Sequence, residues 1–194
     1  MTLADKLTFS RIVLAPVFFV VYLLPQWFPA WFSDGAFWTV PFLWAVFIVS
    51  EITDMLDGMA ARRQKAVSDF GKLFDPFADT LMQITCFLCF VIDGIFPAIL
   101  FLLVIYREFG ILFLRNLMLK KGVAMGARIS GKIKTLTYIL AGGMALLTAS
   151  IQRLAVAEYL LPVFKTAAFV TFCVSVIFSL VSFFDYLAVY RKAA

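Results

Sequence analysis

Long apolar stretches alternate with short polar connections along the whole sequence. Each stretch is close to the roughly 20 apolar residues that an α-helix needs to cross a bilayer core. Pro25 ends the first stretch, and Asp93-Gly94 separates the third from the fourth, because both motifs interrupt helices. The pattern predicts an all-α membrane protein that begins with a short interfacial segment at Met1–Lys6 and has six transmembrane helices, at about residues 7–25, 36–60, 70–93, 95–118, 131–151 and 160–189.

The composition indicates a membrane protein with one domain. Hydrophobic residues make up 63% of the 194 residues and charged residues only 15%, whereas a soluble domain has about 45–50% apolar and about 25% charged residues. The sequence holds no soluble segment, low-complexity tract or long linker. We therefore expect residues 1–194 to form a single multi-pass domain in the cell membrane.

Lysine and arginine are concentrated at the two ends and in the second and fourth connections. Such an excess marks the cytoplasmic side of a membrane protein, so both termini and these two connections are predicted to be cytoplasmic. The net charge of +5 then faces anionic lipid and does not indicate nucleic acid binding. The basic residues concerned are Lys6, Arg11, Arg62, Arg63, Lys65, Lys72, Arg115, Lys120, Lys121, Arg128, Lys132, Lys134, Arg191 and Lys192.

Two closely spaced pairs of aspartates stand out in this apolar sequence, Asp54 with Asp57 and Asp75 with Asp79. The first two are i, i+3 and the last two are i, i+4, so each pair shares one face of a helix. Both pairs are predicted to lie at the cytoplasmic end of the membrane, where unpaired carboxylates would repel one another. One aspartate beside one arginine would be explained by an ion pair, but four at these spacings predict a site for one or two Mg²⁺ or Mn²⁺ ions.

Small residues follow the same helical faces. Gly58 and Ala61 continue the face of the first acidic pair, and Gly71 precedes the second pair by one turn. Small side chains at these positions leave room for a flat or phosphorylated ligand beside the metal ions. Arg62 follows directly and is suited to pair with a phosphate.

Histidine and cysteine chemistry is largely excluded. The sequence has no histidine, so catalytic triads, zinc sites and general bases that depend on histidine are absent. Cys86-x-x-Cys89 has the spacing of a redox pair, but it lies in an apolar stretch. We interpret these two cysteines as small residues that pack between helices.

Residues 54–79, which we call the acidic stretch, resemble as a whole the signature of the CDP-alcohol phosphotransferase family. The matching residues are Asp54-x-x-Asp57-Gly58-x-x-Ala61-Arg62, eight further residues, and Gly71-x-x-x-Asp75-x-x-x-Asp79. The resemblance implies displacement of CMP from a CDP-linked substrate by an alcohol. It also implies a homodimer.

The same resemblance implies a role for each residue of the signature. Asp54, Asp57, Asp75 and Asp79 would ligate the metal ions, and Asp79 would also act as general base toward the hydroxyl group of the acceptor. The residues implied for nucleotide binding are Asp54, Asp57, Gly58, Ala61, Arg62 and Gly71.

The acceptor is indicated by basic residues farther along the sequence. Arg107 interrupts an apolar run, and a cation in such a place needs an anion. Its neighbour Glu108 is not expected to face it, because i, i+1 residues point in different directions on a helix. One interpretation is that Arg107 reaches the interface or pairs with an aspartate. The other is that Arg107, Arg115 and Lys132 bind the phosphate of an acceptor.

Three further motifs resemble the phosphatidylglycerophosphate synthases within this family. They are Leu7-Thr8-x-x-Arg11-x-x-Leu14-x-Pro16-x-Phe18, Arg107-Glu108 and Gly131-Lys132-x-Lys134-Thr135. The resemblance implies CDP-diacylglycerol as donor and glycerol 3-phosphate as acceptor. Inositol phosphate, serine, choline and phosphatidylglycerol are the alternative acceptors.

Two functions of a different kind are disfavoured. A cation or proton transporter would place its acidic residues near the middle of the bilayer and would show repeated halves. A scaffold without activity would be expected to lack one of the four aspartates, and all four are present.

Overall fold

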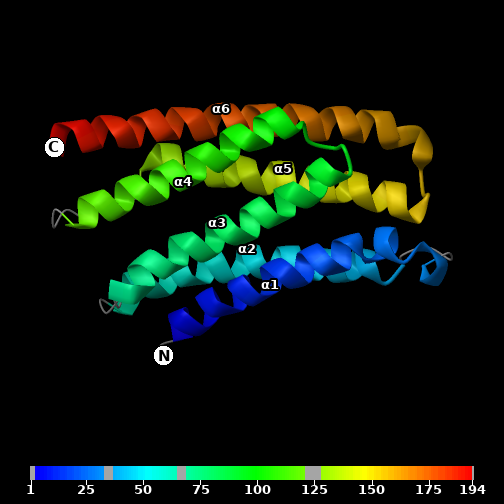
Figure 1. The fold of residues 1–194 in the computed structure, drawn as a ribbon, viewed down its shortest axis with the longest axis horizontal. Helices are drawn as coiled ribbons and strands as arrows, with labels where there is room; N and C mark the ends of the chain where they lie inside the picture. The colour runs from blue at the N-terminus through cyan, green and yellow to red at the C-terminus, as the bar shows by residue number, and fades with distance from the viewer. Residues whose placement is uncertain (1–2, 33–36, 65–68, 121–127, 194) are drawn as a thin grey trace. The chain divides into compact units, whose positions relative to one another are not determined.

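The computed structural model describes residues 3–32, 37–64, 69–120 and 128–193, with side chains except at residues 3–5, 7, 54–64, 69–73 and 192–193. All regular elements within these residues are helical, and no strand occurs among them. The long helices are α1 (Leu3–Trp27), α2 (Thr39–Gln64), α3 (Asp69–Ile92), α4 (Ala98–Lys120), α5 (Ile129–Leu154) and α6 (Leu161–Ala193); short 3-10 helices lie at η1 (Pro29–Trp31) and η2 (Glu158–Leu160) (Figure 1).

The positions of the helices confirm the six predicted stretches, and their ends differ from the prediction by at most about one turn. The predicted break before the fourth stretch is also present. Gly94 has a φ of 68°, a left-handed conformation that glycine adopts without strain. Leu3–Lys6 forms the first turn of α1, whereas the stretch that could span a membrane begins at Thr8, so the interfacial position of Met1–Lys6 stays a prediction. Nothing in Leu3–Leu7 interrupts a helix, so the helix begins before the apolar run.

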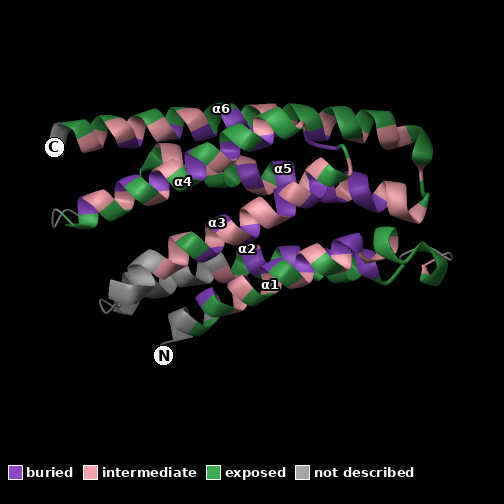
Figure 2. Cartoon of the chain, viewed as in Figure 1, coloured by how far each residue is buried: buried purple, intermediate pink, exposed green. Residues whose placement is uncertain are grey.

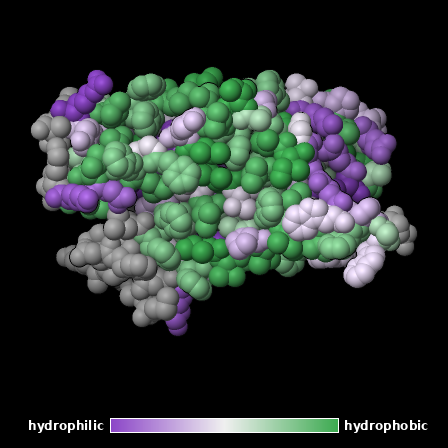
Figure 3. All heavy atoms as spheres, in the orientation of Figure 1, coloured by the Kyte–Doolittle hydropathy of each residue, from purple (hydrophilic) through white to green (hydrophobic). Residues whose placement is uncertain are grey.

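Several of these helices have the length and composition of membrane spans. Within the described residues, four stretches qualify: Thr8–Trp27, Phe74–Ile92, Ile129–Leu154 and Glu158–Arg191. The apolar part of α2, Thr39–Thr53, is shorter, and α4 carries three charged residues in its interior. On the face drawn in Figure 3, apolar residues cover the middle of the helices and hydrophilic residues lie near their ends. The protein is therefore a multi-pass membrane protein.

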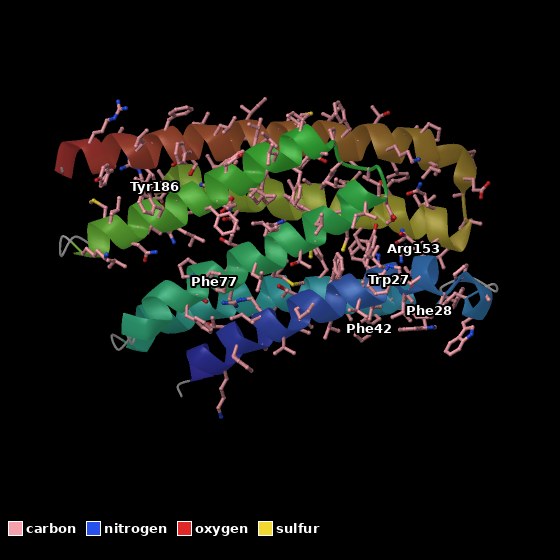
Figure 4. The ribbon with its side chains drawn as sticks, viewed as in Figure 1. Trp27, Phe28, Phe42, Phe77, Arg153 and Tyr186 are labelled. Carbon is pink, nitrogen blue, oxygen red and sulfur yellow. The ribbon has the colours of Figure 1, made fainter. Side chains whose placement is uncertain are left out.

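The chain divides into two compact units, of which unit 1 comprises residues 1–89 and 150–158. In unit 1, α1 packs against α2, and α1 and α3 begin at the same end of the unit (Figure 1). Trp27, Phe28 and Phe42 gather where α1 ends and α2 begins (Figure 4). Cys86 and Cys89 on α3 are buried and form no disulfide, as predicted for packing residues.

Unit 2 comprises residues 90–149 and 159–194. Its α4 packs against α6, and buried residues recur along the length of α4 (Figure 2). The helices approach closely at Gly110, where an added Cβ would lie 2.8 Å from the ring of Phe183. Directly after this glycine, Ile111 and Leu114 on α4 form a buried cluster with Tyr186 on α6.

Candidate active site

The acidic stretch lies on two helices of unit 1, the end of α2 and the beginning of α3. Because one pair of aspartates lies within α2 and the other within α3, the spacings i, i+3 and i, i+4 are helical spacings, as predicted. The side chains of the α2 aspartates and of the predicted nucleotide-binding residues lie outside the described residues, so the meeting of all four carboxylates stays a prediction. The residues concerned are Asp54, Asp57, Gly58, Ala61, Arg62 and Gly71.

Asp75 and Asp79 on α3 meet at one arginine of α1. Nη2 of Arg11 forms an ion pair with Oδ1 of Asp75, and Nε of Arg11 lies 2.8 Å from Oδ1 of Asp79. The hydroxyl of Thr8 donates a hydrogen bond to the same oxygen of Asp75, at 3.1 Å. Asp75 and Asp79 therefore share one face of α3, as their spacing predicts. The sequence analysis named Thr8 and Arg11 as part of a motif and assigned them no role in the site.

The α3 aspartates fit a metal site in their chemistry and exposure. Both offer carboxylate oxygens, the ligands that Mg²⁺ and Mn²⁺ prefer. Their side chains are 37% and 36% exposed, while the arginine that joins them is buried. Among the side chains that the structure describes, no group of three or more possible metal ligands occurs; the other two predicted ligands, on α2, are not among those side chains.

The first basic residue predicted for the acceptor site, Arg107, is buried in unit 2 among protein partners. Its Nη1 donates to Oε1 of Glu108 at 2.9 Å, its Nε to the carbonyl oxygen of Ser179 at 3.1 Å, and its Nη2 to Oγ of Ser182 at 2.9 Å. The prediction that Glu108 does not face Arg107 is thus wrong. The rule describes where side chains leave a helix, and a long arginine side chain can bend back to a neighbouring carboxylate when both groups are buried.

Glu108 has a second cationic partner on α5. Nζ of Lys134 lies 2.8 Å from Oε1 of Glu108 and 4.2 Å from the centre of the Tyr138 ring. The hydroxyl of Tyr138 is 2.6 Å from Oγ of Ser179 on α6. Arg107, Glu108, Lys134 and Tyr138 form what we call the buried charge cluster, which joins α4, α5 and α6.

The other two predicted residues lie elsewhere in unit 2: Arg115 is about two turns farther along α4 than Arg107, and Lys132 is in the first turn of α5. The Arg115 guanidinium lies 5.8 Å from the centre of the Tyr186 ring on α6. Gly131, next to Lys132, is so close to Tyr186 that an added Cβ would lie 3.3 Å from its hydroxyl. Tyr186 points from α6 toward the other helices of unit 2 (Figure 4). The structure therefore brings Arg115 and the first turn of α5 together at Tyr186, which the sequence analysis did not single out.

The start of α5 is also tied to α6 by a carboxylate that the sequence analysis missed. Oδ2 of Asp185 accepts hydrogen bonds from Nε of Arg128 and from Oγ of Ser130, each at 2.6 Å. These bonds fix the beginning of α5, and with it the exposed Lys132, beside α6. An acidic residue near the end of an apolar helix was the available signal, but its partners lie 55 and 57 positions away.

Comparison with known proteins identifies the family. A family model described as CDP-alcohol phosphatidyltransferase matches residues 1–181. The chain belongs to the CDP-alcohol phosphatidyltransferase family. It is therefore an enzyme of a family that generally uses divalent metal ions, and the resemblance seen in the sequence is confirmed.

Individual relatives of this phosphatidyltransferase are similar over most of their length. A protein of Treponema pallidum named CDP-diacylglycerol–glycerol-3-phosphate 3-phosphatidyltransferase is 37% identical over 191 residues, which are 96% of this chain and 88% of the relative. A Bacillus subtilis protein of the same name is 34% identical over 75% of this chain and 76% of its own. A probable phosphatidylglycerophosphate synthase of Mycobacterium tuberculosis is 31% identical over 76% of this chain and 67% of its own.

Proposed function

We propose that this phosphatidyltransferase is a CDP-diacylglycerol–glycerol-3-phosphate 3-phosphatidyltransferase. It transfers the phosphatidyl group of CDP-diacylglycerol to a hydroxyl of glycerol 3-phosphate and releases CMP, a step of phosphatidylglycerol biosynthesis. The observation that carries the proposal is the 37% identity, over 96% of the chain, to a protein of that name. Arg115 beside Tyr186, with Gly131 of the same first turn of α5 as Lys132 close to that tyrosine, supports an acceptor that bears a phosphate.

The donor side of the reaction is assigned to the acidic stretch. Asp54, Asp57, Asp75 and Asp79 hold two Mg²⁺ or Mn²⁺ ions, and Gly58, Ala61, Arg62 and Gly71 take part with the first two aspartates in binding the nucleotide. When bound, the ions offset the charge of the pyrophosphate and stabilise CMP as leaving group. Asp79 accepts the proton of the attacking hydroxyl. Its carboxylate is partly exposed and anchored through Oδ1, which supports this role.

The acceptor side is assigned to the basic residues of unit 2. Arg115 and Lys132 bind the phosphate of glycerol 3-phosphate. Hydrogen bonds between a cationic side chain and a phosphate are stronger than hydrogen bonds between neutral groups. Arg107 belongs to the predicted acceptor site as well, but each of its three guanidinium nitrogens has a protein partner. We therefore assign it an indirect part: it holds α4 against α6 and so positions Arg115.

The proposed arrangement in the membrane is the one predicted from the apolar stretches and the basic residues of the sequence. We propose six spans in a single domain of residues 1–194, with both termini and the active site on the cytoplasmic side. The match of one family model to residues 1–181 supports a single domain. The acyl chains of the donor then stay in the lipid while its CDP group reaches the acidic stretch. A homodimer is the proposed assembly.

A panel of acceptors tests the proposal. Purified protein with CDP-diacylglycerol and Mn²⁺ is expected to release CMP with glycerol 3-phosphate and not with inositol phosphate, serine, choline or phosphatidylglycerol. Addition of EDTA is expected to stop the reaction, and excess Mg²⁺ or Mn²⁺ to restore it. Release of CMP with another member of the panel alone would change the acceptor, and no release with any of them would refute the enzymatic function.

A further inference from the structure

The motif Thr8-x-x-Arg11 near the start of α1 has no part in the reaction described so far. Its two residues are i, i+3 and therefore lie on one face of α1. Both are buried, with 4% of Thr8 and 1% of Arg11 exposed. A buried threonine and a buried arginine at the start of a membrane-spanning helix need partners for their polar groups.

Those partners are Asp75 and Asp79 on α3. The guanidinium of Arg11 pairs with Asp75 through Nη2 and with Asp79 through Nε, so one rigid planar group connects the two carboxylates. Thr8 adds a hydrogen bond to the oxygen of Asp75 that Arg11 also contacts. Each aspartate is thus held through Oδ1 by side chains of α1. The contacts join residues more than 60 positions apart in the sequence.

The geometry indicates that Arg11 orients the two carboxylates and does not merely balance their charge. The fixed fork of a guanidinium can hold two carboxylates in one arrangement, which the single point charge of a lysine ammonium cannot do. Carboxylates that ligate metal ions are in general oriented by hydrogen bonds from neighbouring residues, and these neighbours affect the affinity for the metal.

We propose that Arg11, assisted by Thr8, is a positioning residue of the metal site. The two side chains fix the orientation of Asp75 and Asp79 and so make α1 a structural part of that site. The inference rests on the proposed function in one respect, that Asp75 and Asp79 are metal ligands. It assigns to the Thr8-x-x-Arg11 motif the role of presenting these ligands.

A positioning role and a purely electrostatic role of Arg11 predict opposite changes in Mn²⁺ affinity when Arg11 is replaced. If Arg11 acted only through its charge, its removal would leave the acidic site more negative and Mn²⁺ would bind more tightly. If Arg11 positions the carboxylates, its removal weakens Mn²⁺ binding although a repelling charge is lost. The affinity for Mn²⁺ alone, without substrates, therefore distinguishes the two.

The experiment measures Mn²⁺ binding to the full-length protein in detergent by electron paramagnetic resonance of the free ion. Arg11→Gln is expected to raise the Kd about 10- to 100-fold, the range seen for residues that orient metal ligands. Arg11→Lys keeps the charge and is expected to give a Kd between those of Arg11→Gln and the wild type. Thr8→Val, nearly isosteric, is expected to raise the Kd about threefold through loss of one hydrogen bond. Lys6→Gln removes a positive charge from an exposed position of the same helix and is expected to leave the Kd unchanged.

The outcomes separate this inference from the proposed function. An unchanged or lower Kd in Arg11→Gln would overturn the inference, while CMP release by the wild type with glycerol 3-phosphate would leave the proposed function in place. Wild-type protein that binds no Mn²⁺ and releases no CMP would overturn both. Circular dichroism and thermal unfolding in detergent show whether each variant is folded. If Arg11→Gln does not fold, Arg11→Lys and Thr8→Val decide, and wild-type affinity in both would refute the positioning role.

Discussion

Lys134 on α5 and Glu108 on α4 form an ion pair in which Nζ lies 2.8 Å from Oε1. The same oxygen accepts the hydrogen bond from Arg107, so one buried carboxylate serves two cations. Only about 5% of the Glu108 side chain is exposed. Water cannot replace a lost partner at such a site, and the stability of unit 2 should therefore depend on this carboxylate.

Glu108→Gln is expected to destabilise the protein strongly. The substitution keeps the size of the side chain but leaves two cations without their shared carboxylate, a change that costs about 3–5 kcal/mol when one partner of a buried pair is removed. Equilibrium unfolding in mixed detergent measures the loss. Glu158→Gln, the same change at an exposed position, serves as control and should shift the free energy of unfolding by less than about 0.5 kcal/mol. Equal stability of the two variants would show that the buried charge cluster does not hold the helices together.

Arg115→Ala is expected to raise the KM for glycerol 3-phosphate about tenfold or more while kcat changes little. Loss of charge-assisted hydrogen bonds to a bound phosphate weakens binding in the ground state and the transition state alike. Steady-state kinetics with varied glycerol 3-phosphate give both constants. Lys120→Ala removes a basic residue from the exposed end of the same helix and should leave the KM near that of the wild type. If both variants bind the acceptor normally, its phosphate is not held at Arg115.

The helices could be predicted from the sequence because their signal is local. A run of apolar residues of about the right length predicts each one, and Gly94 stands where the backbone turns left-handed between α3 and α4. Pro25 was a less exact signal, because α1 continues through it to Trp27. The spacing of Asp75 and Asp79 likewise fixed their common face.

The partners of the charged residues could not be predicted in the same way. Arg11 meets Asp75 across 64 positions and Arg107 meets Ser179 across 72, and no periodicity within one helix specifies which helix faces which. For Arg107 the rule that i, i+1 residues do not face each other was misleading. Its side chain leaves the helix in a different direction from that of Glu108, but it is long enough to bend back to the carboxylate. Tyr186 gave no signal at all, since one tyrosine in an apolar helix is ordinarily a packing residue.

Gly110→Ala is expected to destabilise unit 2 although alanine favours helix formation. The added methyl group would lie 2.8 Å from a ring atom of Phe183, so the ring or the helix must move, at a cost of about 1–3 kcal/mol. Gly143→Ala provides a matched control, because an added Cβ there meets no atom within 4 Å. That variant should gain up to about 1 kcal/mol from the better helix propensity of alanine. Thermal unfolding in detergent measures both, and a Gly110→Ala variant as stable as Gly143→Ala would contradict the close packing of α4 on α6.

Asp79→Asn is expected to abolish turnover while binding of the CDP group stays measurable. The amide keeps the size of the side chain but cannot accept the proton of the attacking hydroxyl, and loss of a general base lowers rates about 10²- to 10⁴-fold. CMP release measures turnover, and displacement of a labelled CDP-diacylglycerol measures binding. Asp93→Asn makes the same change just after the other end of α3 and should keep activity near that of the wild type.

The ion pair with Arg11 adds a further expectation for Asp79→Asn. The amide of this variant offers only a neutral oxygen to a buried guanidinium, so Mn²⁺ affinity should fall together with turnover. A variant with near-normal CMP release would remove Asp79 as the base, and one with lost turnover but unchanged Mn²⁺ affinity would separate its proton-accepting role from its role as a metal ligand.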